Sequence, residues 1–173
     1  INSRIGNGLG DYSIIEQKLS NSINNKPWEA CLTMGKNWGY NRYDTVYKKP
    51  DILIRNFVDI VSKGGNLLLN VGPDAKGNIP RESVEILREV GKWMSKNKES
   101  IYGCGISNFE KPDWGRYTQK DNVIYAHVYE TPLGALPLYG ISPEQLAEIT
   151  YLADGSEVKR GEAWNTALYT DVA

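Results

Sequence analysis

The chain has 173 residues, which is enough for one ordinary domain or for parts of two. Its hydrophobic share of 40%, charged share of 24% and formal net charge of −1 are typical of a globular protein, and they give no electrostatic reason to expect nucleic acid or an anionic membrane as a partner. No apolar run approaches the ~18–20 residues that a membrane-spanning helix needs. The cysteines Cys31 and Cys104 are too few for a disulfide framework, and with the single histidine His127 they form no zinc-binding pattern.

The first part of the chain alternates between loops and one apolar strand. We expect Ile1–Gly10 to be the end of a strand that runs into a loop, and the polar stretch Asp11–Asn25 to be irregular. Trp28–Met34 is predicted to be a strand in which Cys31 is a buried thiol, and Gly35–Asn41 is predicted to be the loop that follows it.

A helix, a tight turn and a buried strand follow. Pro50–Ser62 is predicted to be a helix because its apolar residues recur at i, i+3, i+4 and i+7, as Ile54, Phe57, Val58 and Val61. Gly64 and Gly65 are typical of a helix end. The uninterrupted Leu67–Leu69 predicts a strand over Asn66–Val71 that is covered on both faces. A second helix is predicted over Pro80–Lys98.

Repeated strand–loop–helix units are the layout of a (β/α)8 barrel, whose active site lies at the carboxyl ends of the strands. Only three or four of the eight units fit before Gly105, so the predicted fold class is α/β, an incomplete TIM-like barrel. From Tyr117 onward the chain changes to short strands separated by turns, which predicts part of an antiparallel β-sandwich. Its strands are expected at Val123–Glu130, Leu136–Ile141, Ala147–Ala153 and Ala167–Val172, with a hairpin turn at Asp154–Gly155.

Residues suited to sugar recognition gather near the predicted strand ends and loops. Sugar sites combine carboxylates, an arginine and aromatic faces, because hydroxyls need directed hydrogen bonds and the C–H faces of the ring stack on aromatics. The candidates are Arg4, Asp11, Glu16, Trp28, Glu29, Trp38 and Tyr40. From composition alone, ordinary roles stay open: Trp28 in the core, Glu29 in a salt bridge and Glu16 on a solvated loop.

Three sequence blocks together resemble a known enzyme family. They are WEACLTMGKNWGYN from Trp28, SKGGNLLLNVGP from Ser62 and GKWMSKNKESIYG from Gly91. Their order and spacing resemble those of the α-L-fucosidases of glycoside hydrolase family 29. The resemblance covers roughly residues 1–105 and implies that residues 1–106 are the carboxyl-terminal part of the catalytic barrel and residues 107–173 part of the β-sandwich domain.

The resemblance also implies roles for individual residues. Glu16 matches the general acid/base, Arg4 matches an arginine that contacts substrate, and Trp38 matches an aromatic that lines the fucose pocket. Ser3 stands where the family commonly has Asp, and Ile14-Ile15 stand where it often has Thr-Pro. Glu29 is the second candidate for the acid/base, although a role in anchoring the barrel fits it better. The nucleophilic Asp is expected upstream of Ile1, so the 173 residues alone are expected to be inactive.

The implied function is that of a retaining, exo-acting α-L-fucosidase that releases terminal fucose by double displacement, without a metal or an organic cofactor. The expected partner is a fucosylated oligosaccharide or glycoconjugate, with no nucleic acid and no membrane, and the oligomeric state is open. The alternative is a non-catalytic carbohydrate-binding or structural remnant of such an enzyme. A bacterial source is expected, and secreted, periplasmic and cytoplasmic locations all stay open.

Overall fold

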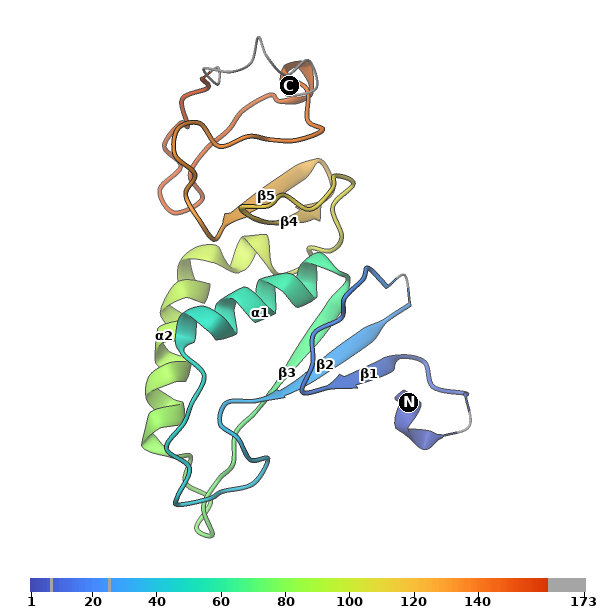
Figure 1. Ribbon diagram of the computed structural model, residues 1–173, viewed down its shortest axis with the longest axis vertical. Helices are drawn as coiled ribbons and strands as arrows, with labels where there is room; N and C mark the ends of the chain where they lie inside the picture. Colours follow the sequence, from blue (N-terminus) through green and yellow to red (C-terminus); the bar gives the residue numbers. More distant parts are fainter. Residues whose placement is uncertain (7, 25, 162–173) are drawn as a thin grey trace.

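The computed structural model describes residues 1–6, 8–24 and 26–161. A three-stranded sheet, two helices and a β-hairpin form its framework (Figure 1). Its elements, in chain order, are the strands β1 (Ser13–Glu16) and β2 (Trp28–Thr33), the helix α1 (Pro50–Ser62), the strand β3 (Gly65–Asn70), the helix α2 (Arg81–Asn97), and the strands β4 (Gly115–Lys120) and β5 (Val123–Val128). Short 3-10 turns lie at Ser3–Ile5, Lys98–Ser100 and Pro143–Gln145.

The predicted helices and the two predicted strands between residues 28 and 71 are confirmed to within one or two residues. The prediction that Asp11–Asn25 is irregular is wrong at its start, where the four residues of β1 lie. A strand this short is set by its neighbour rather than by its own pattern, because Ser13–Glu16 pairs with the first four residues of β2.

All three strands of the sheet are parallel, in the order β1-β2-β3. Glu16 is opposite Cys31, and Thr33 is opposite Asn70. A parallel bridge between Asn2 and Tyr12 continues the same pattern on the far side of β1. Four consecutive segments therefore run in one direction, and the predicted strand–loop–helix repeat is present from β2 through α1 and β3 to α2.

Helix α1 covers one face of this sheet (Figure 1). Trp28, Ala30 and Leu32 of β2 pack there with Ile60 of α1, and each is at most 3% exposed. The alternate residues of the strands face the other way, since side chains alternate along a strand. That opposite face carries Leu68, which is 44% exposed. The prediction that the Leu67–Leu69 strand is covered on both faces is therefore wrong for the described residues, because α1 covers only one face.

A close contact between Trp28 and Gly65 joins β2 to β3. A Cβ added to Gly65 would lie 2.3 Å from the Trp28 ring, so only glycine leaves room for the indole. The indole Nε1 donates to the carbonyl of Lys63 at 3.1 Å, and Gly64 turns the chain with a φ of +78°. The Gly64–Gly65 pair that marked the helix end in the sequence thus also makes room for the main core aromatic.

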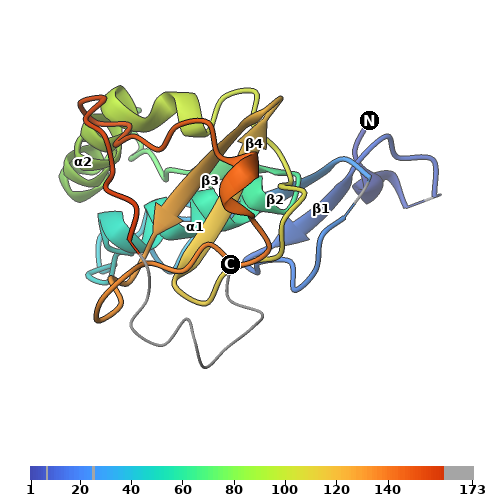
Figure 2. The same ribbon diagram turned by 90° about the horizontal axis from the view of Figure 1, so that it is seen from above.

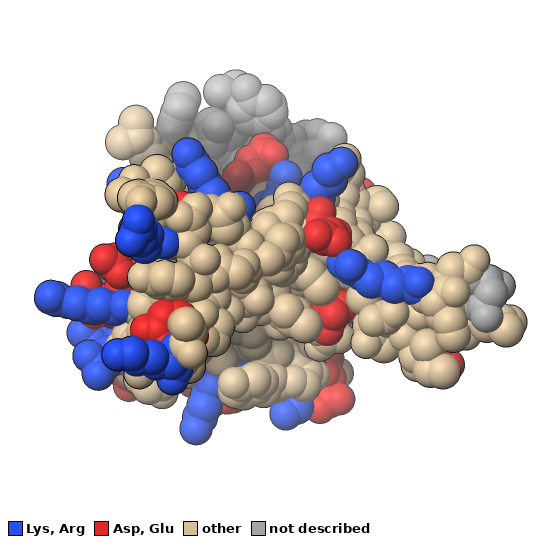
Figure 3. All heavy atoms as spheres, turned by 90° about the horizontal axis from the view of Figure 1, so that it is seen from below, with Lys and Arg blue, Asp and Glu red and all other residues tan. Residues whose placement is uncertain are grey.

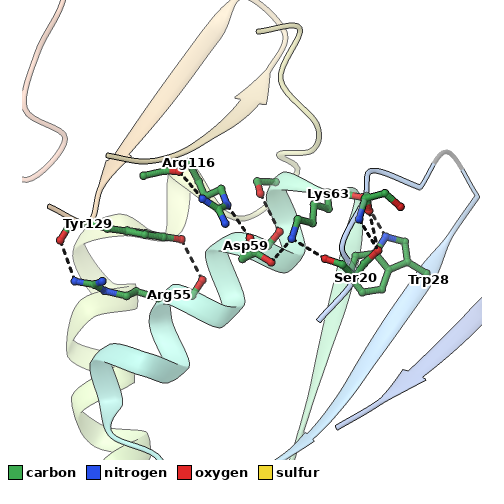
Figure 4. A network of polar contacts seen from close by, with 10 residues as sticks. Ser20, Trp28, Arg55, Asp59, Lys63, Arg116 and Tyr129 are labelled. Atoms are coloured by element: carbon green, nitrogen blue, oxygen red, sulfur yellow. Dashed lines mark hydrogen bonds and ion pairs between the residues drawn. The ribbon is translucent and has the colours of Figure 1, made fainter. Parts of the chain in front are cut away.

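The hairpin of β4 and β5 packs across α1 on the side away from the parallel sheet (Figures 1 and 2). Asp59 of α1, whose side chain is 7% exposed, accepts from Arg116 Nε at 2.7 Å and from Lys63 Nζ at 2.6 Å. Lys63 also donates to the carbonyl of Ser20 at 2.7 Å (Figure 4). One buried carboxylate therefore connects the hairpin, the helix and the segment that follows β1.

A second set of contacts between α1 and the hairpin lies one turn earlier on the helix. Arg55 donates to the carbonyl of Tyr129 at 2.9 Å, and the Tyr129 hydroxyl donates to the carbonyl of Arg55 at 3.0 Å (Figure 4). Nearby, the ring of His127 lies 3.0 Å from the Thr118 hydroxyl, and burial lowers the pKa of His127 to about 4. His127 is therefore neutral at pH 7 and is a packing residue of this junction.

The tail after β5 differs from the predicted β-sandwich. Leu136–Ile141 is not a strand: Leu136, Leu138 and Ile141 pack on Trp114 and Tyr117, while Pro137 lacks the N–H that a ladder needs. Within Ala147–Ala153 the only pairing is the bridge between Thr150 and Glu157, and Gly155 makes the predicted turn with a φ of +72°. The predicted strand Ala167–Val172 lies outside the described residues.

The described part of the chain contains neither a candidate membrane-spanning helix nor a candidate metal-binding cluster. None of its helices has the length and the apolar character needed to cross a bilayer. Its His, Cys, Asp and Glu side chains form no group of three or more that could bind a metal ion.

The contact between Trp28 and Gly65 predicts opposite effects for two glycine-to-alanine changes. Gly65→Ala should lower the free energy of unfolding by about 1–3 kcal/mol or more, because the new methyl group overlaps the indole. Gly91→Ala is the matched control, since Gly91 lies on the exposed side of α2 with no atom near its Cβ position, and it should raise that free energy by about 0.5–1 kcal/mol. Urea unfolding followed by far-UV circular dichroism measures both, and equal effects would contradict the role given to Gly65.

The Asp59 network predicts a large effect of removing one carboxylate. Asp59→Ala should lower the free energy of unfolding by about 3–5 kcal/mol, because the largely buried cations Lys63 and Arg116 then have no counter-charge. Glu85→Ala breaks the exposed i,i+4 pair with Arg81 and should change the same quantity little. If the two variants unfold at the same urea concentration, Asp59 does not hold the hairpin against α1.

Candidate active site

The carboxyl ends of the three parallel strands bring the candidate residues to one edge of the sheet. Glu16 is the last residue of β1, Thr33 the last of β2 and Asn70 the last of β3. The loops that leave β2 and β3 lie side by side at the bottom of Figure 1. This edge is where an α/β fold of this kind places its functional residues.

Arg4 and Glu16, which were both predicted to be site residues, form an ion pair through Arg4 Nη2 and Glu16 Oε2. Their side chains are 54% and 44% exposed, so both are open to a ligand. Arg4 is held in the 3-10 turn Ser3–Ile5, where Asn2 Oδ1 accepts from the Arg4 amide at 3.1 Å. Ser3, at the position where the family commonly has Asp, accepts from the amide of Ile14 at 3.2 Å and so ties this turn to β1.

Trp38 lies on the loop that follows β2, and it is 39% exposed rather than buried in the core. The end of β3 contacts the backbone of this loop. Asn70 Nδ2 donates to the Trp38 carbonyl at 2.6 Å, and a Cβ at Gly72 would meet the backbone of Gly39 at 2.7 Å. Asn70 is thus a residue that positions the Trp38 loop.

Asp44 organises the interior of the same loop. Its Oδ2 accepts from the amide of Lys36 and from Asn37 Nδ2, both at 3.2 Å. A cavity of about 20 Å³ lies between this loop and the end of β3, lined among others by Met34 and Tyr40. It has room for about one water molecule and is too small for a sugar ring.

The remaining candidates take structural roles. Trp28 is 1% exposed and lies in the core, which is the structural role that the sequence had left open for it. Glu29 Oε1 accepts from the Cys31 thiol at 3.4 Å, and the salt bridge expected for Glu29 is not among the ion pairs of the described residues. Burial and this hydrogen bond raise the pKa of the Cys31 thiol, which is buried as predicted. Asp11 is exposed, and its amide donates to the carbonyl of Ile1 at 2.7 Å.

Two residues at this edge were not identified from the sequence. Gln17, directly after Glu16, hydrogen-bonds to Thr33, and Lys48 Nζ donates to the Thr33 carbonyl at 2.6 Å. Burial lowers the pKa of the Lys48 ammonium. No composition or spacing signal marks them, because their partners lie 15 or 16 residues away along the chain.

The surface around this edge suits an uncharged ligand. Figure 3 views the molecule from below, the side on which the loops after β2 and β3 lie in Figure 1, and Lys and Arg side chains are interspersed there with Asp and Glu and with uncharged surface. A neutral sugar needs no field of one sign, whereas a nucleic acid would need a positive one.

Comparisons with known proteins agree with these features. The sequence model of the family described as alpha-L-fucosidase matches residues 1–99. An α-L-fucosidase of Dictyostelium discoideum is 42% identical over 110 residues, which is 61% of this chain and 24% of that protein.

Solved structures are similar over more of the chain. Alpha-L-fucosidase isoenzyme 1 from Paenibacillus thiaminolyticus has a TM-score of 0.88 and 46% identity, over 94% of this chain and 40% of that one. A family 29 α-L-fucosidase from Bacteroides thetaiotaomicron has a TM-score of 0.77 and 31% identity, over 89% of this chain and 38% of that one. That structure is a covalent intermediate trapped with 2-fluoro-fucosyl fluoride in a Glu-to-Gln mutant.

The chain spans about a quarter of the Dictyostelium relative and 40% of the Paenibacillus structure. The matched region contains the parallel sheet, both helices and the paired Arg4 and Glu16. The chain belongs to the α-L-fucosidase family of glycoside hydrolases.

Proposed function

We propose that the protein containing this chain is a retaining, exo-acting α-L-fucosidase that releases terminal α-L-fucose from glycans or glycoconjugates. The observation that carries the proposal is the pair of Arg4 and Glu16 at the carboxyl edge of a parallel sheet, in a chain of the α-L-fucosidase family. The Bacteroides relative, trapped as a covalent intermediate in a Glu-to-Gln mutant, supports double displacement with a catalytic glutamate. The relatives reported above are named as fucosidases, which gives no support to the alternative of a non-catalytic remnant.

The architecture is part of the same proposal. We place the carboxyl-terminal units of a (β/α)8 barrel in residues 1–106 and part of a β-sandwich domain in residues 107–173. Four parallel segments in sequential order, with α1 packed on one face and α2 packed on α1, support the barrel. The uncovered face, which carries Glu16 and Leu68, would then be turned to the barrel interior. The antiparallel β4–β5 hairpin supports the second assignment.

In the proposed reaction, Glu16 is the general acid/base. A nucleophilic carboxylate attacks the anomeric carbon of fucose, the bond to the leaving oxygen breaks, and that oxygen takes the proton of Glu16. In the second step a water molecule gives its proton to Glu16 and attacks the anomeric carbon, while the bond from that carbon to the nucleophilic carboxylate breaks. Fucose leaves with its original configuration, and the carboxylate is free again. We place the nucleophile outside the 173 residues.

Arg4 and Trp38 are proposed to bind the sugar. Glu16 must carry a proton to act as the acid, so its ion pair with Arg4 has to open when substrate enters, and the guanidinium then donates to sugar hydroxyls. Trp38 offers an exposed aromatic face on a loop fixed by Asn70, against which the C6 methyl group of fucose can pack. The proposed site uses no metal and no organic cofactor.

The role of Glu16 predicts a leaving-group signature in the complete enzyme. Glu16→Gln should slow substrates with poor leaving groups by about 10²–10⁴-fold, because these cannot depart without a proton. Aryl fucosides with good leaving groups should form the intermediate and then stall, since water lacks its base. Azide needs no base, so it should restore their turnover and give the α-fucosyl azide, with the configuration of the substrate retained.

Glu29→Gln is the matched control for this experiment, since Glu29 lies on the neighbouring strand and its oxygen accepts only from Cys31 among the described contacts. It should show neither the leaving-group dependence nor azide rescue. If Glu16→Gln keeps wild-type rates on natural fucosides, Glu16 is not the acid/base, and Glu29 becomes the next carboxylate to test.

Sugar binding by Trp38 and Arg4 predicts weaker affinity for fucose itself. Trp38→Ala should cost about 1–3 kcal/mol of binding free energy through lost cover of the methyl group. Arg4→Ala should cost a similar amount through lost charge-assisted hydrogen bonds. Titration calorimetry with fucose measures both, with Tyr102→Ala, an exposed aromatic beyond α2, as the control. Wild-type affinity in either site variant would remove that residue from the sugar site.

A further inference from the structure

The residue after Glu16 has an unusual backbone. Gln17 has a φ of +54°, in the left-handed region that residues other than glycine, asparagine and aspartate seldom adopt. Its amide still donates to the carbonyl of Cys31 at 2.9 Å, so the chain turns away sharply as soon as the pairing of β1 with β2 ends. Strain of this kind persists only where surrounding contacts enforce it, and it concentrates at functional sites.

The enforcing contacts come from the Gln17 side chain. Its Nε2 donates to Thr33 Oγ1 at 2.9 Å, and its Oε1 accepts from the Thr33 amide at 3.4 Å. Thr33 is 1% exposed, and its hydroxyl passes the connection on by donating to the carbonyl of Gly35 at 2.6 Å. The end of β1 is therefore clamped to the end of β2 by an amide and a buried hydroxyl.

Thr33 also holds the loop of Trp38 at both ends. Gly35, which accepts from its hydroxyl, begins that loop, while Lys48 Nζ, which donates to its carbonyl, comes from the segment that leads into α1. Lys48 is further fixed by a bond from its amide to the carbonyl of Met34 at 2.8 Å. One threonine thus connects the residue after Glu16 with the loop that carries Trp38.

We propose that Gln17 and Thr33 are positioning residues that set the Glu16 carboxylate relative to the Trp38 loop. This inference rests on the proposed function, in which Glu16 moves protons and Trp38 covers the sugar. A proton donor must lie within hydrogen-bond reach of the leaving oxygen, and a displacement of about 1 Å can cost 10²-fold in rate. The left-handed turn at Gln17 and the hydroxyl of Thr33 keep Glu16 at that position without touching substrate.

Two variants test whether the hydrogen bonds between Gln17 and Thr33 affect catalysis separately from the stability of the fold. Thr33→Val keeps the shape of the side chain and removes the hydroxyl, while Gln17→Gly keeps the left-handed turn without strain and removes the amide. In the complete enzyme, each should lower kcat on fucosides with poor leaving groups by about 10- to 100-fold. KM and fucose affinity should change little, and azide should restore part of the turnover of activated aryl fucosides. Thr33→Ser, which keeps the hydroxyl, should stay within a few-fold of wild type.

Thr118→Val is the matched control, because Thr118 is also fully buried and its hydroxyl donates to the carbonyl of Ser100 at 2.7 Å, away from the site. It should lower thermal stability without any dependence on the leaving group. Wild-type kcat in both Thr33→Val and Gln17→Gly would overturn the proposal, and so would an equal loss on all substrates. Glu16→Gln measured in parallel tests the proposed function itself: if it lacks the acid/base signature, the function is wrong whatever the clamp variants do.

Discussion

The indole of Trp28 lies over Gly65, and these two residues are also partners in the register of β2 and β3. Because position 65 has no side chain, the largest aromatic of the core can close the space between the strands and donate to the Lys63 carbonyl behind them. This contact sets the start of both strands. It therefore also sets their ends, where Thr33 is opposite Asn70 and where the loops of the candidate site begin.

This register places the candidate site residues near one another. In a parallel sheet all carboxyl ends meet at one edge, so Glu16, Thr33 and Asn70 become neighbours although more than fifty residues separate the first from the last. Side chains at and just after these strand ends then connect neighbouring loops through hydrogen bonds. Gln17 reaches Thr33, Thr33 reaches Gly35, and Asn70 reaches Trp38.

The opposite end of the sheet is tied to the hairpin by a buried charge network beside the apolar cluster of Val58, Val61 and Ile101. Asp59 lies buried between Lys63 and Arg116, and Lys63 continues the connection to Ser20 in the segment after β1 (Figure 4). Buried carboxylates are costly unless every oxygen is paired, and both oxygens of Asp59 are. The hairpin thereby has one defined position on α1, and the segment that returns from Glu16 toward β2 is held by the same network.

Much of the fold was predictable from sequence because local rules decide it. The period of apolar residues and the Gly64–Gly65 pair placed both helices and the strand between them, and the motif resemblance pointed to Arg4, Glu16 and Trp38. Other features depended on partners distant in sequence. β1 exists because β2 lies beside it, and the Leu136–Ile141 segment packs on Trp114 and Tyr117 without forming a ladder because Pro137 lacks an N–H. Among the described residues, one face of β3 is uncovered. The Arg4–Glu16 pair and the Gln17–Thr33 clamp likewise needed the tertiary structure, since hydrogen bonds and ion pairs across 12 or 16 residues follow from where strands end in space and leave no periodic trace in the chain.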